Sequence, residues 1–465
     1  MTEPAAGRKR YHIWTIGCQM NEADSRRLAQ QLEFSGWSPV VDPAEADLVV
    51  INTCVVRQQA ENKAYSKIGQ IGSIKESNPG LMIGLMGCMV GMKETPALQR
   101  KFPYVDVFLP PSETRPLLDF LEQKGLMQAL LDQEARERSI REAIQDEDLP
   151  LPQDDIGRTI TANVPVVLGC SHACTFCVIP YRRGAERSRP MAEILRETES
   201  LARQGIKEIM LLGQIVDRYG TDFHDDTNLS HLLRETAQID GIERIRFLTS
   251  HPNYMTDSIL ETVAEVGKVC PQIEVPIQAG NNQVLENMRR GYTQEQYRAL
   301  VEKIRSIIPD AAIHTDIIVG FPGETEAQFM DTWHLLNDLR LDKIHLAKYS
   351  VRPKTIAARK MKDDVPHEEK SRRWVLLEQL QRKILEEKNR ALQGTVVEVL
   401  VENQVKGQWH GRTPHAKPVM IADDTRNLHG KLVEVFVDWT GPFNLLGRPV
   451  DLLDRERQPA EAFAV

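Results

Sequence analysis

The sequence predicts an α/β protein in three parts: an N-terminal parallel α/β domain, a central partial (β/α)6 barrel and a small C-terminal antiparallel β-barrel. Three observations predict this fold. Apolar strand-like runs alternate with amphipathic helical stretches up to residue 125, six further strand-like runs follow, and the last runs are rich in β-branched residues. With 465 residues, of which 41% are hydrophobic, the chain is long enough for several folded domains.

The N-terminal domain is expected at residues 9–125. Its strand-like runs lie at residues 11–18, 46–54 and 81–88. An amphipathic helix follows the first run and ends at Gly36. Each run ends in a cysteine, at Cys18, Cys54 and Cys88. Because the carboxyl ends of parallel strands share one edge of a sheet, we expect these thiols to converge. Taken singly, each thiol is equally compatible with ordinary core packing.

A charged helical stretch at 133–144 and the acidic, proline-rich residues 146–155 predict a linker over 126–155. The central domain is expected at 156–386. Its six strand-like runs lie at residues 164–169, 206–213, 243–250, 272–279, 312–321 and 343–350, with helix-like stretches between several of them. Six βα units indicate a parallel barrel that is smaller than the eight-unit form and partly open.

The C-terminal domain is expected at 389–455, after a long charged helix over residues 367–392. Three strand-like runs follow that helix, at residues 394–403, 417–423 and 431–439. Turn residues separate them. This pattern predicts a small barrel of the oligonucleotide-binding (OB) kind.

Three cysteines with the spacing CxxxCxxC give the strongest chemical signal, at Cys170, Cys174 and Cys177. Thiolates so placed can hold three irons of a [4Fe-4S] cluster and leave the fourth iron free to chelate a small molecule. Zinc ligation and core packing are the alternatives, and His172 is the nearby extra ligand that zinc would need. An open iron indicates a catalyst. Cys270 has no partner triplet and is expected to pack in the core.

The string GCSHACTFCVIPYRRGAERSRP, residues 169–190, resembles the methylthiotransferases of the radical S-adenosylmethionine superfamily. The strings around Cys18, Cys54 and Cys88 resemble the N-terminal domain of the same family. The resemblance implies that S-adenosylmethionine binds the open iron at Cys170, Cys174 and Cys177, and that its reductive cleavage gives a 5′-deoxyadenosyl radical. It also implies a second [4Fe-4S] cluster in the N-terminal domain that supplies the inserted sulfur.

Strand ends of the central domain match the family's cofactor site. The segment Gly320–Thr325 (GFPGET) opens a helix, and its amides could hold an anionic group or form a plain turn. The resemblance implies cofactor contacts from Phe176, Gln214, Thr315, Asp316, Gly320 and Gly323. This chain departs from the family pattern at strand ends, notably at Ile215, Glu274, Ala279 and Lys354.

Basic residues near the barrel mouth favour RNA binding, although the formal net charge is −8. The candidates are Arg182, Arg183, Arg187, Arg189, Arg352 and Lys354. The C-terminal module resembles the TRAM domain. The family resemblance implies methylthiolation of C2 of N6-isopentenyladenosine at position 37 of tRNA, using two [4Fe-4S] clusters and two S-adenosylmethionine molecules. Related members act on a threonylcarbamoyl-type tRNA adenosine or on a ribosomal-protein aspartate. An iron-sulfur electron carrier or scaffold and a zinc-dependent RNA-binding protein are the alternatives from other classes.

The expected partners are a tRNA anticodon stem-loop, an electron donor of flavodoxin or ferredoxin type and a sulfur donor. The N-terminus lacks the apolar core of a secretory signal, and the longest apolar stretch, residues 81–92, is too short to span a bilayer. We therefore expect a cytoplasmic protein without membrane association, and a monomer.

Overall fold

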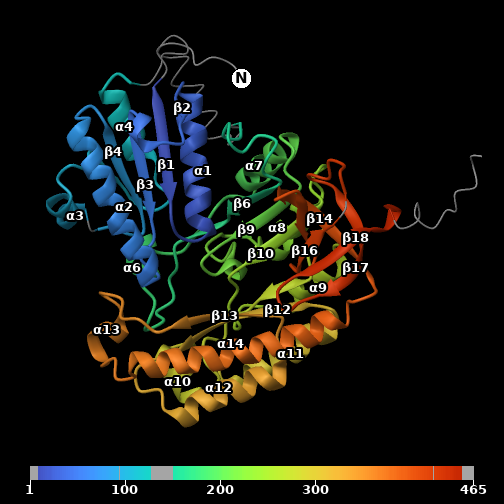
Figure 1. The fold of residues 1–465 in the computed structure, drawn as a ribbon. Helices are drawn as coiled ribbons and strands as arrows, with labels where there is room; N and C mark the ends of the chain where they lie inside the picture. The colour runs from blue at the N-terminus through green and yellow to red at the C-terminus, as the bar shows by residue number, and fades with distance from the viewer. Residues whose placement is uncertain (1–8, 94, 127–149, 423, 453–465) are drawn as a thin grey trace, which may run out of the picture.

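The computed structural model describes residues 9–93, 95–126, 150–422 and 424–452. The helix expected at 133–144 lies outside these residues, as does most of the expected linker. Figure 1 shows the three expected parts, with the N-terminal domain in blue, the central domain from green to orange and the C-terminal barrel in red. Within the described ranges, no helix is long and apolar enough to cross a membrane.

The N-terminal domain is a five-stranded parallel sheet with helices on both faces. Its strands, in spatial order, are β2 (Ser38–Pro39), β1 (Arg10–Thr15), β3 (Leu48–Thr53), β4 (Met82–Gly87) and β5 (Val107–Leu109). The helices are α1 (Gln19–Phe34), α2 (Gln58–Ser77), α3 (Thr95–Lys101) and α4 (Arg115–Gln123). Leu28 and Leu117 join α1 and α4 in one buried cluster, whereas Ile68 and Leu98 belong to the cluster on the other face. The predicted α/β domain is confirmed.

The central domain contains six parallel strands in two connected sheets. Their bounds are β6 (Thr161–Pro165), β9 (Glu208–Leu212), β10 (Arg244–Leu248), β11 (Gln272–Glu274), β12 (Ala312–Val319) and β13 (Lys343–Lys348). The sheet orders are β10-β9-β6 and β11-β12-β13, and a parallel bridge from Ile245 to Val269 joins them. The predicted partial barrel is therefore confirmed.

The first barrel strand is shifted from its predicted position at 164–169. Barrel pairing ends at Pro165, and Val167–Leu168 instead form β7, which pairs antiparallel with β8 (Arg187–Ser188). Gly169 follows in the left-handed region at φ 72°, where a Cβ would lie 2.1 Å from the Ala185 carbonyl oxygen. Only glycine permits this close approach. The apolar run is thus divided between the barrel wall and a hairpin that encloses the cysteine loop.

Helices surround the outside of the partial barrel. They are α7 (Met191–Arg203), α8 (Leu229–Ala237), α9 (Asp257–Glu265), α10 (Asn282–Met288), α11 (Gln294–Ile307), α12 (Glu326–Leu339) and α14 (His367–Arg390), with the short helices α6 (Ile179–Arg183) and α13 (Ile356–Lys360) near the mouth. Helix α14 packs along β13, where Gln381 accepts a hydrogen bond from the Ile344 amide. It then leads directly into the C-terminal barrel (Figure 1).

The C-terminal domain is a closed five-stranded barrel. Its strands are β14 (Val396–Val405), β15 (Gln408–Arg412), β16 (Pro418–Ile421), β17 (Leu432–Thr440) and β18 (Leu445–Pro449). The expected small barrel is confirmed, but β15 and β18 were not predicted, because one is polar and the other contains glycine and proline. Four of the pairings are antiparallel, and β16 pairs with β18 in parallel.

A buried ion network fastens the C-terminal barrel to the amino ends of the central strands. Glu208 accepts from Arg246 at 2.8 Å and from Arg412, on β15, at 2.7 Å. Arg246 also donates to the main-chain carbonyls of Thr413 and Pro414. The Arg246 and Glu208 side chains are 0% and 1% exposed, so these contacts are shielded from solvent.

The N-terminal domain docks on the open side of the partial barrel, beside β6. Met20, at the start of α1, packs with Met210 and Leu248 in one buried cluster. Further along α1, Arg26 donates to the Asn163 carbonyl. The beginning of α1, which directly follows Cys18, therefore lies against the interior of the barrel.

Lys354 adopts a left-handed conformation with φ 74°. A side chain in this region costs roughly 1–2 kcal/mol relative to the right-handed form, whereas glycine adopts it freely. We expect Lys354→Gly to raise the free energy of unfolding by about 1 kcal/mol, measured by urea denaturation. Lys360→Gly, in helix α13, is the matched control and should lower it by a similar amount. A destabilised Lys354→Gly variant would contradict the assignment of strain.

Candidate iron-sulfur and substrate site

The three N-terminal cysteines converge as predicted. Cys18, Cys54 and Cys88 follow β1, β3 and β4, three neighbouring strands of one sheet. Burial raises the pKa of Cys88 to about 11, and the charges of Cys54 and Cys18 add to this effect. Cys18 is exposed, whereas Cys54 and Cys88 are buried. The trio therefore forms a site with one accessible side.

Arg183 brings a buried cation from the central domain to this trio. Its charge opposes the rise in the pKa of Cys88, and its guanidinium lies 3.4 Å from Asp24 and 3.2 Å from the Ser112 hydroxyl. Its side chain is 3% exposed. A cation at this position favours thiolates and the negative charge of a thiolate-bound cluster.

The central cysteines form a second trio with its own cation. Burial raises the pKa of Cys177 to about 12, and the neighbouring charges of Cys174 and Cys170 add to it. Arg290 donates to Cys174 Sγ at 3.2 Å, and it also donates to the Tyr292 hydroxyl at 2.8 Å. Two buried thiols and a half-buried one beside a guanidinium fit an anionic iron-sulfur cluster better than three neutral core cysteines.

His172, the candidate extra ligand for zinc, has its hydrogen-bond and ring partners outside the cysteine trio. Its Nε2 is hydrogen-bonded to the Tyr254 hydroxyl at 2.8 Å, and its ring lies 4.7 Å from that of His251. Arg218 lies over the Tyr254 ring at 4.7 Å. These partners hold the imidazole within an aromatic cluster. Cys270 is 3% exposed and lies apart from both trios, as expected.

Phe176, Gln214 and Asp316 are three of the predicted cofactor contacts. Phe176 and Gln214 are half-buried near the cysteine loop, where the family departure Ile215 packs against Cys170. Phe176 and Gln214 remain predicted cofactor contacts. Burial raises the pKa of Asp316 to about 6, against the opposing charges of Arg57 and Arg290, so its carboxyl faces the same region.

Thr315, another predicted cofactor contact, uses its hydroxyl for hydrogen bonds within the barrel. It is fully buried, and its hydroxyl donates to the Val275 carbonyl at 3.1 Å and accepts from the Ile277 amide at 3.0 Å. These bonds tie β12 to the end of β11. The residue is therefore part of the barrel wall.

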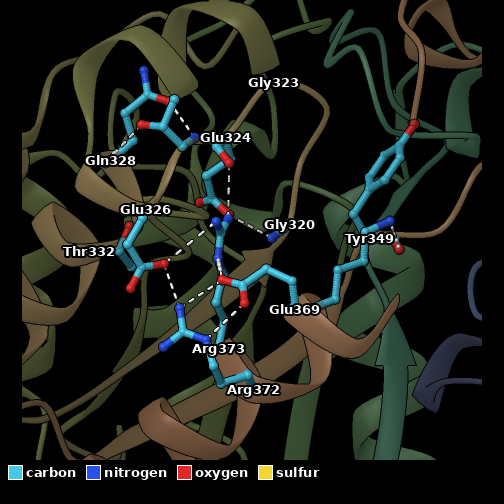
Figure 2. Close-up of polar contacts among 12 residues, drawn as sticks. Gly320, Gly323, Glu324, Glu326, Gln328, Thr332, Tyr349, Glu369, Arg372 and Arg373 are labelled. Carbon is cyan, nitrogen blue, oxygen red and sulfur yellow. Dashed lines mark hydrogen bonds and ion pairs between the residues drawn. The ribbon is translucent and has the colours of Figure 1, made fainter. Parts of the chain in front are cut away.

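The GFPGET segment binds its own carboxylates. The Gly320 amide donates to Glu324 at 2.6 Å, and the Gly323 amide donates to Asp364 at 2.7 Å. Figure 2 shows Glu324 between Gly320 and Arg373, which stabilises its charge at 2.8 Å. A Cβ on Gly320 would lie 2.3 Å from Lys370. Carboxylates of the same chain occupy both amides in this conformation, and the cofactor contacts of Gly320 and Gly323 stay a prediction.

Three of the predicted RNA-binding arginines are also buried in intramolecular contacts. Arg183 serves the N-terminal trio, Arg189 pairs with Glu197 at 2.8 Å, and Arg352 pairs with Glu61 at 2.7 Å. The arginine-rich pattern could not distinguish buried ion pairs from surface cations. The other three candidates differ in exposure: Arg187 and Lys354 are exposed, and Arg182 is half-buried.

A cavity of about 250 Å³ lies between the inner face of the partial barrel and the C-terminal barrel. Its lining includes Gln19, next to Cys18, and the inward side chains of Glu274, His314 and His345. Gln19 places Cys18 of the N-terminal trio next to this cavity. The charge of Asp316 adds to the raised pKa of Glu274. In the sequence, the departure from the family pattern at Glu274 was the one signal that pointed to this cavity.

Two family models match the chain. The model of the Radical SAM superfamily covers residues 164–336, and that of the uncharacterized protein family UPF0004 covers residues 10–110. A tRNA-2-methylthio-N6-dimethylallyladenosine synthase of Dehalococcoides mccartyi is 42% identical over 445 residues, which are 96% of this chain and 99% of that relative. The chain belongs to the tRNA-2-methylthio-N6-dimethylallyladenosine synthase family.

Other members of the synthase family agree with this assignment. The Dictyoglomus thermophilum enzyme is 42% identical over 95% of this chain and its own full length. Among solved structures, the radical S-adenosylmethionine methyltransferase TsrM of Kitasatospora setae matches with a TM-score of 0.54 and 16% identity, over 76% of this chain and 75% of that one. This last likeness concerns the fold alone. Membership of the superfamily implies a [4Fe-4S] cluster and S-adenosylmethionine as cofactors.

Proposed function

We propose that this protein methylthiolates C2 of N6-isopentenyladenosine, the N6-dimethylallyl form, at position 37 of tRNA. The observation that carries the proposal is the pair of cysteine trios, each with a buried arginine beside it. A simple electron carrier does not need clusters held by only three cysteines, which leave one iron open. The names of relatives that span nearly the whole chain support the substrate.

The two cysteine trios would carry out different parts of the reaction. Cys170, Cys174 and Cys177 would hold the cluster that works with S-adenosylmethionine, and together these groups supply one-electron chemistry able to activate a C–H bond. Cys18, Cys54 and Cys88 would hold a second [4Fe-4S] cluster and present sulfur to the same base. Arg290 and Arg183 would offset the negative charge of the two thiolate sets.

The substrate would be the anticodon stem-loop of tRNA, with the target base splayed out of the loop. Proteins read RNA sequence mainly on unstacked bases whose edges are free, and an enzyme acting on a base must extract it from its stack. The reaction needs a reductant of flavodoxin or ferredoxin type and a donor that replaces the consumed sulfur.

The test uses the full chain with both clusters reconstituted, S-adenosylmethionine and dithionite. Three substrates are compared: a stem-loop with N6-isopentenyladenosine, one with the threonylcarbamoyl-type adenosine, and a ribosomal-protein peptide with the aspartate. Mass spectrometry should find the methylthio group on the first substrate. Exclusive modification of either other substrate would assign the protein to that activity, and no modification of any would refute the proposal.

A further inference from the structure

Three polar side chains gather on the inner face of β11, β12 and β13. Glu274 lies opposite His314 in the parallel register, and His345 lies opposite Asp316, two residues further along β12. One nitrogen or oxygen from each of Glu274, His314 and His345 lies within 4.8 Å of the others. All three line the interior cavity. They are close enough to contact one small ligand together.

The hydrogen bonds of His314 decide which kind of ligand fits. Arg246 donates to Gln272 Oε1 at 2.6 Å, which turns the Gln272 amide nitrogen toward His314 Nδ1 at 3.3 Å. Nδ1 therefore accepts, and in the neutral ring Nε2 carries the proton. Burial lowers the pKa of His314 to about 3, so the ring is neutral. An Nε2–H group donates hydrogen bonds and is not a metal ligand. This tautomer favours an organic acceptor over a cation.

Glu274 completes a donor and acceptor pattern. Burial raises its pKa to about 8, and the charge of Asp316 adds to the shift. Among the described residues, no hydrogen bond to its carboxyl is found. A protonated carboxyl offers one donor and one acceptor side by side. An adenine edge has the complementary pair, a ring-nitrogen acceptor next to an exocyclic N–H.

The outer end of the cavity carries features suited to single-stranded nucleic acid. Phe443, on the β17–β18 turn, is 43% exposed, and Lys343 Nζ lies 5.8 Å from its ring. Lys417 lines the same cavity, where its ammonium donates to Asn389 Oδ1 at 2.8 Å and lies 4.0 Å from Asp342. Proteins bind unpaired strands with aromatic surfaces for base stacking beside cations for the backbone. The opening lies where the C-terminal barrel meets the partial barrel.

We propose that Glu274, His314 and His345 read the edge of the target adenine, and that the base reaches them through the opening bordered by Phe443, Lys343 and Lys417. This inference rests on the proposed function and deepens it by naming the groups that recognise the base. The protonated carboxyl pairs with a ring nitrogen and the N6–H, and His314 Nε2–H donates to a second ring nitrogen. An ionised carboxylate would lack the donor.

The test measures binding, so it does not depend on turnover. Cluster-reconstituted full chain without reductant is titrated with two fluorescent stem-loops, one with N6-isopentenyladenosine and one abasic at that position. Wild type should prefer the base. Glu274→Leu should reduce this preference about tenfold or more, because a good bidentate contact to a base contributes that much discrimination. Glu274→Gln should retain it, since a carboxamide also offers one donor beside one acceptor.

Glu302→Leu is the matched control, because Glu302 is exposed on the outer helix α11. It should bind like wild type. His345→Leu provides a second variant at a more accessible position, and it should weaken the preference several-fold. Far-ultraviolet circular dichroism and iron content verify that each variant folds and retains its clusters.

Two results would overturn the inference. One is an unchanged base preference in both Glu274→Leu and His345→Leu. The other is stoichiometric Zn²⁺ binding by wild type that is lost in both variants, which would identify a metal site. If wild type yields methylthiolated tRNA while the variants keep the preference, only the inference fails. If wild type neither binds nor modifies the stem-loop, the proposed function fails as well.

Discussion

Replacing Cys174 with alanine is expected to abolish both 5′-deoxyadenosine and methylthiolated tRNA, whereas Cys54→Ala should lose only the thiolation. Cys174 belongs to the trio in the central domain, where S-adenosylmethionine would be cleaved. Cys54 belongs to the separate trio beside Arg183. The measurement is chromatography of 5′-deoxyadenosine together with mass spectrometry of tRNA nucleosides, with dithionite as the reductant.

The matched control for these variants is Cys270→Ala. Cys270 is equally buried but belongs to neither trio. This variant should keep both products and the full iron content, roughly eight irons per chain for two [4Fe-4S] clusters. Each of the other variants should lose about half of that iron. Normal thiolation by Cys54→Ala would show that the N-terminal trio does not deliver the sulfur.

Replacing Glu208 with glutamine should lower the free energy of unfolding by about 3–5 kcal/mol, the usual cost of removing one partner from a buried ion pair. Burial alone would raise the pKa of Glu208, but the charges of Arg246 and Arg412 outweigh it and lower the pKa. The carboxylate is therefore ionised, and glutamine would leave the buried Arg246 guanidinium without a counter-charge and Arg412 with Glu402 alone. Urea denaturation followed by tryptophan fluorescence measures the loss.

Glu243→Gln is the control for Glu208. Glu243 forms an exposed pair with Lys207 at 3.9 Å, and such pairs contribute at most about 1 kcal/mol. The stabilisation by Glu208 is present above its unfolded pKa of roughly 4.3 and is lost as the pH falls through the lowered folded value. The difference between wild type and Glu208→Gln should therefore shrink under strong acid. A loss below 1 kcal/mol at neutral pH would contradict the role of the network.

The sequence predicted the architecture well because strand periodicity and cysteine spacing are local signals. The runs that end at Cys18, Cys54 and Cys88 were predicted to end at one edge of a parallel sheet, and the corresponding strands do so. The prediction of β15 and β18 failed because their short sequences lack an apolar pattern. The first barrel strand was placed too late because Val166–Gly169 is as apolar as Thr161–Pro165, and only the close approach at Gly169 separates the two.

Long-range pairing explains the errors in the site. Arg183, Arg189 and Arg352 have the composition of a basic surface, yet Asp24, Glu197 and Glu61 neutralise them. The Gly320 and Gly323 amides have the local geometry of an anion site, yet acids of the same chain fill it. No local rule identifies such partners. The cavity triad was missed for the same reason, since its members come from three strands.

The manner in which Arg246 holds Thr413 and Pro414 has an evolutionary consequence. Arg246 donates hydrogen bonds to the main-chain carbonyl oxygens of these two residues, and every amino acid has such an oxygen. Substitutions in that loop can therefore accumulate without detaching the module, provided that the backbone path is kept. The outward surface of the C-terminal barrel can change while its attachment to the central domain is kept.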